Sequence, residues 1–162
     1  MLIREVREED VPEICKLPTA QEELFYCFPK SVFPLAEETV RESILTRTDS
    51  TVIEAEGRIV AFANFYHWGS EVCAIGNVVV KASHRGCGIA RLLIRHMIEL
   101  GFDKHGTNAI KVSCFNRNAA GLLLYAKLGF QPCAIEQRTD YNGERVALVH
   151  FQLQKAAALT VR

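Results

Sequence analysis

The chain has 162 residues, with 19 basic and 19 acidic side chains, so its formal net charge at neutral pH is zero. A protein that binds nucleic acid usually has more Lys and Arg than Asp and Glu. The equal numbers here therefore argue against nucleic-acid binding. Because 49% of the residues are hydrophobic, a chain of this length can form a core without disulfides or metals. We expect a single domain over residues 1–162.

The cysteines and the N-terminal residues predict the compartment. The six cysteines are scattered, with no CxxC pair and no zinc-ligand spacing, which favours reduced thiols and no metal site. Residues 1–10 are charged and lack the apolar run of a signal peptide, and no stretch approaches the length of a membrane span. These features predict a cytoplasmic protein with no membrane partner.

The N-terminal part is predicted to form one strand and two helices. Residues 2–6 suit a short strand, and residues 8–17 place apolar side chains on one side of a helix. Residues 18–34, which are rich in proline and aromatic residues, are expected to be irregular. A second helix is predicted over residues 35–46, with a proline at its entry.

The middle of the chain changes to strand periodicity. Residues 51–66 read as two strands joined at Glu56-Gly57, because a turn beside a glycine suits a hairpin. Residues 73–80 predict another strand, and its end, Val-Val-Val, favours burial on both faces. Residues 87–100 repeat apolar side chains at helical spacing and predict an amphipathic helix.

The C-terminal third predicts a strand, a helix and two further strands, over residues 109–115, 118–128, 131–138 and 145–153. Gly129 occupies a normal helix-ending position, Asn142-Gly143 is a strong hairpin turn, and residues 155–162 are expected to be frayed. The resulting order, β-α-α-β-β-β-α-β-α-β-β, predicts an α/β fold. Its sheet would be mixed and mostly antiparallel, of about seven strands, with helices on both faces.

A glycine-rich turn separates the strand over residues 73–80 from the amphipathic helix. Residues 84–90 read His-Arg-Gly-Cys-Gly-Ile-Ala. Glycines allow a tight turn and close approach of a ligand, and the helix start offers free N–H donors to a phosphate. A P-loop would need Lys-Ser or Lys-Thr after its last glycine, and a dinucleotide site would need a third glycine. Neither is present, which leaves a cradle for an acyl-CoA as the third candidate.

Two segments together resemble the GNAT superfamily of acetyl-CoA-dependent N-acetyltransferases. Residues 85–90 are similar to its Arg/Gln-x-x-Gly-x-Gly/Ala signature, and residues 118–130 to its Asn-x-x-Ala-x-x-Leu-Tyr-x-x-x-Gly-Phe segment. Residues 77–81 resemble its fourth strand, and the segments occur in the expected order. Ala82 and Gly121 stand where proline and alanine are commonest, but neither change removes a functional atom.

The resemblance implies the GNAT fold and acetyl-CoA as co-substrate. Backbone amides of residues 85–90 would hold the CoA pyrophosphate, and Arg85 would add positive charge unless it is an ordinary surface arginine. Cys87 would be a passive loop residue, because the family transfers acetyl directly. The implied cofactor-binding residues are Val78, Val79, Val80, Arg85, Gly86, Cys87, Gly88, Ile89, Ala90, Asn118, Gly121 and Tyr125.

Asn118 and Tyr125 are seven residues apart and therefore lie on one face of their predicted helix. Gly121 lies between them, where a glycine costs about 1 kcal/mol relative to alanine and suggests a ligand packed closely along this face. The resemblance implies that Asn118 contacts the CoA arm and that Tyr125 is the general acid for the leaving thiolate. The alternatives are a helix N-cap for Asn118 and a core aromatic for Tyr125.

Gly76 lies inside a predicted strand, where a glycine often marks a bulge. The superfamily that this chain resembles has a bulge in its fourth strand, which separates that strand from the fifth and admits the thioester arm. The resemblance then implies that a backbone N–H near Val78 or Val79 polarises the acetyl carbonyl.

The general base and the acceptor site are less defined by the sequence. Glu71 lies at the start of the predicted fourth strand and His67 at the end of the third, and either is a candidate base, directly or through water. The acceptor is expected over residues 21–35, where acids would attract a cation and aromatic rings would wall a pocket. The alternative is that these rings cap the core. The candidate acceptor residues are Glu22, Glu23, Phe25, Tyr26 and Phe28.

These features predict an N-acetyltransferase that moves acetyl from acetyl-CoA to a primary amine of a small molecule or peptide by direct attack. A non-catalytic acyl-CoA-binding sensor domain is the alternative, and the presence of Tyr125 argues against it. No metal, nucleic-acid or membrane partner is expected. A homodimer would fit the family resembled, although nothing in the sequence selects an oligomeric state.

Overall fold

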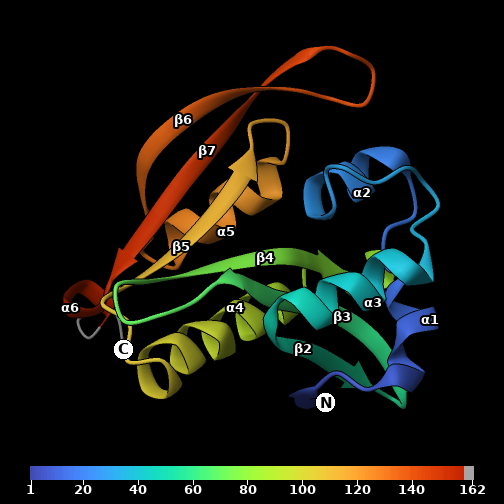
Figure 1. Cartoon of the computed structure of the whole chain (residues 1–162), viewed down its shortest axis with the longest axis horizontal. Helices are drawn as coiled ribbons and strands as arrows, with labels where there is room; N and C mark the ends of the chain where they lie inside the picture. Colours follow the sequence, from blue (N-terminus) through green and yellow to red (C-terminus); the bar gives the residue numbers. More distant parts are fainter. Residues whose placement is uncertain (159–162) are drawn as a thin grey trace.

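The computed structural model describes residues 1–158, and across them seven strands form one sheet in the order β1-β2-β3-β4-β5-β7-β6. Every neighbouring pair is antiparallel except β4 and β5, which run parallel. The hairpin of β6 and β7 extends from one end of the molecule (Figure 1). The strands are β1 Leu2–Glu5, β2 Thr48–Ala55, β3 Arg58–His67, β4 Val72–Val80, β5 Ala109–Phe115, β6 Gln131–Thr139 and β7 Arg145–Gln154.

Helices cover both faces of this sheet. The α-helices are α1 Val11–Ile14, α2 Gln21–Cys27, α3 Glu37–Thr46, α4 Ile89–Glu99, α5 Ala119–Lys127 and α6 Lys155–Ala158. Short 3-10 turns cover Glu8–Asp10 and Ala82–His84, and a π-turn over Leu100–Lys104 continues α4. Within residues 1–158 no helix is long and apolar enough to cross a bilayer.

Two large hydrophobic clusters, one on each face of the sheet, form most of the core, and a smaller third one contains Phe25, Phe115 and Val146. Val52 packs with α1, α2 and α3, whereas its neighbour Ile53 packs with α4, and both side chains are fully buried. Successive residues of a strand point to opposite faces, so a strand with both faces covered is apolar along its whole length. The predicted α/β sheet of about seven strands, mostly antiparallel with helices on both faces, is confirmed.

Several predicted boundaries differ from the structure. The helix predicted over residues 8–17 is instead a 3-10 turn followed by the one-turn helix α1, because Pro18 favours an extended Leu17 and stops the helix. The segment 18–34, expected to be irregular, contains α2. Residues 155–158, expected to be frayed, form α6, and residues 159–162 lie outside the described residues.

Both predicted hairpin turns are confirmed. Glu56 and Gly57 have φ angles of 52° and 73°, the left-handed conformation that a tight two-residue turn requires. In the second turn the Asp140 carboxylate accepts the backbone N–H groups of Asn142 and Glu144, each at 2.8 Å. Gly143 adopts a φ of 78° in this turn.

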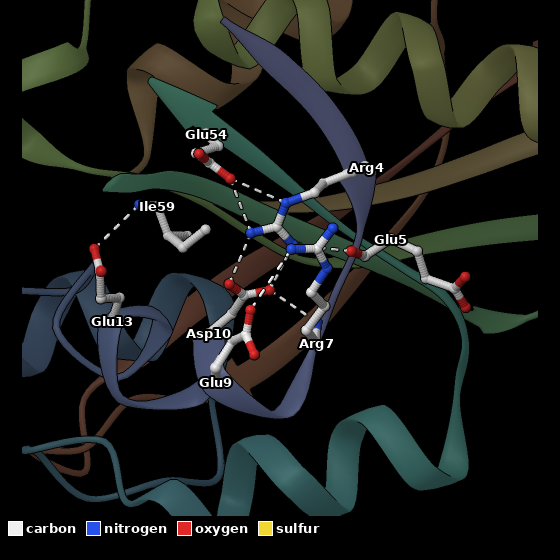
Figure 2. Close-up of polar contacts among 8 residues, drawn as sticks. All are labelled: Arg4, Glu5, Arg7, Glu9, Asp10, Glu13, Glu54 and Ile59. Carbon is white, nitrogen blue, oxygen red and sulfur yellow. Dashed lines mark hydrogen bonds and ion pairs between the residues drawn. The ribbon is translucent and has the colours of Figure 1, made fainter. Parts of the chain in front are cut away.

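A partly buried ion pair connects β1 to the turn that follows it (Figure 2). The Arg4 guanidinium donates to both oxygens of Asp10, at 2.7 and 2.9 Å, and its Nε donates to Glu54 at 3.0 Å. Asp10 also accepts the backbone N–H of Arg7 at 2.7 Å. These hydrogen bonds, above all the one from Arg4, hold the pKa of the Asp10 carboxyl below its usual value despite its burial.

Replacing Asp10 with Asn is expected to lower the free energy of unfolding at pH 7 by about 2 kcal/mol, since the Arg4 cation then faces an uncharged amide. The pKa of Asp10 is depressed by folding, so its contribution is present above the unfolded value and is lost as pH falls through the folded value. Urea denaturation should therefore show a gap between wild type and variant that narrows below about pH 4.

The exposed pair of Arg7 and Glu9, 3.6 Å apart, provides the matched control. The Glu9→Gln change should alter the unfolding free energy by less than about 0.5 kcal/mol, because exposed ion pairs contribute little. A gap for Asp10→Asn that stays constant from pH 7 to pH 3 would mean that packing, rather than charge, is responsible.

Candidate active site

The sheet opens where its two parallel strands separate. β4 and β5 pair from Val72–Ala109 as far as Ile75–Val112. Beyond that point β4 stays paired with β3, and β5 stays paired with β7 as far as Phe115. Figure 1 shows the two strands diverging toward the side where α2 lies.

A bulge in β4 lies at the opening. Phe62 pairs with Val79 and Asn64 with Gly76, so β4 contains one residue more than β3 between these pairs. Asn77 there has a φ of 51°, and its side chain is fixed from two helices. Its amide donates to the Cys27 carbonyl at 2.7 Å, while its oxygen accepts the Ser43 hydroxyl at 2.7 Å. A bulge leaves backbone N–H and C=O groups of the strand unpaired, so that they are available to a ligand.

A cleft of about 660 Å³ occupies the opening. It brings together five predicted site residues from distant parts of the sequence, which are Phe25, Tyr26, Val78, Asn118 and Tyr125. The other predicted site residues do not line it. They are Glu22, Glu23, Phe28, His67, Glu71, Val79, Val80, Arg85, Gly86, Cys87, Gly88, Ile89, Ala90 and Gly121.

Tyr125 lies on α5 and is 5% exposed. Its ring packs edge-on against Phe130, with the ring centroids 5.8 Å apart, and burial raises the pKa of its hydroxyl. Within residues 1–158 this hydroxyl has no hydrogen-bond partner, although it belongs to a residue that lines the cleft. A protonated phenol without a partner among the described residues is free to donate to a ligand.

Asn118 begins α5 as its N-cap, and its side-chain oxygen accepts the Gly121 N–H at 3.1 Å. The N-cap alternative for Asn118 is therefore confirmed, and Asn118 also lines the cleft. A Cβ at Gly121 would lie 2.7 Å from the Cys114 sulfur. The neighbour that requires a glycine in this helix is thus a protein side chain, whereas the sequence suggested a ligand.

The glycine-rich turn leads into α4 with its backbone donors available. Gly86 and Gly88 have φ angles of 75° and 88°, and Gly88 is the N-cap of α4 without a capping side chain. Unlike side-chain-capped starts, such a helix start keeps its first N–H groups free for an anion. The exposed Cys87 thiol donates to the His84 carbonyl at 2.8 Å.

Arg85 and Glu23 connect this turn to α2. The Arg85 Nε donates to the Val80 carbonyl at 3.0 Å, and its Nη1 lies 2.6 Å from Glu23. The Arg85 guanidinium, with lesser help from Thr19, lowers the pKa of Glu23 to about 2. Glu23 is therefore engaged with the arginine of the turn, rather than free to attract a cationic acceptor.

Of the other candidate acceptor residues, some line the cleft and one is buried in the core. Tyr26 lines the cleft and its hydroxyl donates to Glu22 at 2.9 Å, while burial and this carboxylate raise its pKa to about 12. Phe25 stacks on Phe115 with centroids 4.3 Å apart. Phe28 is buried in the core, so for this ring the core-capping alternative is the observed one.

His67 and Glu71 are exposed at the connection between β3 and β4. That connection comes before the part of β4 that pairs with β5. Glu71 is five positions before Gly76 at the opening, which is roughly 16 Å along an extended strand. Neither side chain lines the cleft. The structure thus places both candidate bases outside the cleft that Tyr125 lines.

A hydrogen-bonded row of Ser113, His150 and Glu136, which sequence reasoning missed, borders the cleft. Ser113 and His150 are directly paired residues of β5 and β7, and both line the cleft. The Ser113 hydroxyl lies 2.6 Å from His150 Nδ1, and His150 Nε2 lies 2.5 Å from the Glu136 carboxylate on β6. The hydrogen bond from His150 lowers the pKa of Glu136, which keeps it ionised.

Cationic side chains were also missed. Lys30, Arg47 and Arg138 line the cleft, and among residues 1–158 no Asp or Glu does. Within the same residues, no group of three or more His, Cys, Asp or Glu side chains could hold a metal. The polar side chains that line the cleft therefore carry hydroxyl, imidazole, amide, thiol and cationic groups.

The fold is that of the acetyltransferases. The ribosomal-protein-alanine N-acetyltransferase of Brucella melitensis is 21% identical with a TM-score of 0.78, over 95% of this chain and 99% of that chain. A putative acetyltransferase of Salmonella typhimurium, solved with its cofactor acetyl-CoA, is also 21% identical. Its TM-score is 0.74, over 95% of this chain and 93% of that chain. At these identities the likeness concerns the fold alone.

Sequence comparison then gives the family. The model of the Acetyltransferase (GNAT) family matches residues 13–130, and the chain belongs to this family. Streptothricin acetyltransferase of Streptomyces lavendulae is 29% identical over 98 residues, which are 57% of this chain and 51% of that protein. The chain therefore matches about half the length of this curated relative.

Proposed function

We propose that the chain is an N-acetyltransferase that moves acetyl from acetyl-CoA to a primary amine by direct attack in a ternary complex. The observation that carries the proposal is the cleft between β4 and β5, which is lined by the unpartnered hydroxyl residue Tyr125 and by the bulge at Val78. Membership of the GNAT family supports acetyl-CoA as the donor.

The residues fit an acyl-CoA at two separate places. The start of α4, with two left-handed glycines and no capping side chain, suits the pyrophosphate. The half-exposed Arg85 lies at the same turn, paired with Glu23. The opening between β4 and β5 suits the pantetheine arm, which would pass Asn118. Acetyl-CoA supplies an activated thioester carbonyl.

The protein then has two tasks at the thioester. The amine nitrogen attacks the acetyl carbon, the carbon–sulfur bond breaks, and the thiolate leaves. Tyr125 donates its phenolic proton to that thiolate, since its raised pKa keeps it protonated at neutral pH. A backbone N–H of the bulge near Val78 stabilises the charge that develops on the carbonyl oxygen.

We assign the general base to His150, acting through Ser113. Ionised Glu136 can only accept hydrogen bonds, so it accepts one from Nε2–H of His150, and the unprotonated Nδ1 accepts from Ser113. Ser113 can then take a proton from the acceptor amine while passing its own proton to Nδ1. His67 and Glu71, which lie outside the cleft, have no comparable arrangement.

The test is release of CoA thiol from acetyl-CoA across a panel of primary amines, including free amino acids, polyamines, aminoglycosides and peptides with free N-termini. Thiol release that depends on both substrates, with one acetylated product, is the expected result. Tight binding of acetyl-CoA without thiol release on any amine would favour the non-catalytic sensor and overturn the proposed reaction.

A further inference from the structure

Among residues 1–158, no carboxylate neutralises the charge of Arg47. Arg47 ends α3, lines the cleft, and donates from Nη1 to the side-chain oxygen of Asn64 at 3.2 Å. Its guanidinium lies over the Tyr66 ring, 5.6 Å from the centroid. Within residues 1–158 no carboxylate pairs with it, and burial lowers the pKa of Arg47.

The other two cations of the cleft differ from Arg47. Arg138 is paired with Glu136 at 3.2 Å, and Lys30 is exposed. Removing a charge from water is costly unless an opposite charge compensates for it. Because Arg47 is only singly hydrogen-bonded by the protein, most of its five N–H donors remain available, in the fork geometry that suits a carboxylate.

The position of Arg47 is fixed relative to the bulge by a chain of hydrogen bonds. The side-chain oxygen of Asn64 accepts a hydrogen bond from Arg47, and its amide donates to the Ser43 hydroxyl at 2.9 Å. That hydroxyl in turn donates to Asn77 at 2.7 Å. Gly76 provides the space, since a Cβ there would lie 2.8 Å from Arg47 Nη1. The glycine at the start of the bulge therefore leaves room for the guanidinium.

The spacing defines the size of the ligand. Gly76, beside Arg47, is two residues from Val78, which is at most about 7 Å in an extended strand and less across the bulge. One small molecule with an amine and a carboxylate a few bonds apart can place its carboxylate on Arg47 and its nitrogen at the thioester. A polycationic acceptor would instead meet three cations and no acid among the described lining residues.

We infer that the acceptor is a free amino acid whose carboxylate binds the guanidinium of Arg47 while its amine is acetylated. This inference rests on the proposed N-acetyltransferase function and names its substrate class. It reverses the charge preference that the sequence suggested through Glu22 and Glu23, which bond to Tyr26 and Arg85 instead.

The experiment compares the common L-amino acids with their α-carboxamides in the thiol-release assay, with rates expressed per unprotonated amine. The wild-type chain is expected to prefer the best amino acid over its amide by about 30- to 100-fold in kcat/KM. The Arg47→Gln variant should lose that preference, raising the KM for the acid by a similar factor and leaving the amide nearly unchanged. Arg47→Lys should fall between the two.

Arg58→Gln, which removes an exposed cation outside the cleft, is the matched control and should keep the wild-type preference. Calorimetric affinity for acetyl-CoA reports whether the Arg47 variants are folded. Equal use of acids and amides, or a preference that survives Arg47→Gln, would overturn the inference while leaving the transferase intact. No thiol release with any amine would overturn the proposed function itself, and the inference with it.

Discussion

The Tyr125→Phe variant is expected to lower kcat by about 100-fold or more while changing the affinity for acetyl-CoA by less than about threefold. Only the hydroxyl is removed, and within the described residues that hydroxyl bonds to no protein group, so the packing against Phe130 is preserved. The loss arises because the CoA thiolate must then leave without a proton donor. Steady-state thiol release at saturating acetyl-CoA measures kcat, and calorimetry measures the affinity.

Tyr141→Phe is the control for Tyr125→Phe, since Tyr141 is half-exposed, packs edge-on to Phe25 and does not line the cleft. It should retain nearly full turnover. If Tyr125→Phe also turns over at the wild-type rate, Tyr125 is a core aromatic and the acid must be sought elsewhere.

The second large effect is expected at His150. The His150→Gln variant removes the imidazole that receives the proton through Ser113, and kcat/KM at pH 7 should fall by about 100-fold. The defect should shrink to about tenfold or less near pH 9.5, where more of the amine is already unprotonated. Such recovery is characteristic of a lost base, because a purely structural defect would remain at high pH.

The Glu136→Gln variant separates the effect of the carboxylate charge from that of the imidazole orientation in the row of Ser113, His150 and Glu136. The amide oxygen of Gln can still accept from His150 Nε2, so the orientation is kept while the negative charge is lost, and a decrease of about tenfold is expected. His105→Gln is the matched control, because His105 forms a similar contact of 2.6 Å with Asp49 outside the cleft. A His150→Gln variant that equals this control at pH 7 would exclude His150 as the base.

Local patterns in the sequence were sufficient for the frame of the fold. The turn at Glu56-Gly57, the cap at Asn118 and the glycine-rich start of α4 depend on residues near one another in the chain, and their conformations follow from backbone sterics and unpaired N–H groups. The bulge near Gly76 was also predicted. In contrast, α2 was missed because its apolar residues are consecutive, and contact with the core determines its helical state.

The parts of the site that were missed depend on contacts between distant residues. Ser113 and His150 meet only because β5 and β7 pair in one particular register, which no local pattern defines. Arg85 and Glu23 are 62 positions apart, and their contact shows why two acids near an aromatic cluster do not define a cation site. Arg47 looked ordinary in the sequence because its lack of a counter-ion is a property of the folded chain.

Titration calorimetry of the wild-type chain with acetyl-CoA tests the central claim most directly, which is that the opening between β4 and β5 and the start of α4 hold an acyl-CoA. Saturable binding at one site per chain, with displacement by CoA, is the predicted result. Absence of binding would contradict the assignment of residues 85–90 to the pyrophosphate and, with it, the proposed roles of Tyr125, His150 and Arg47.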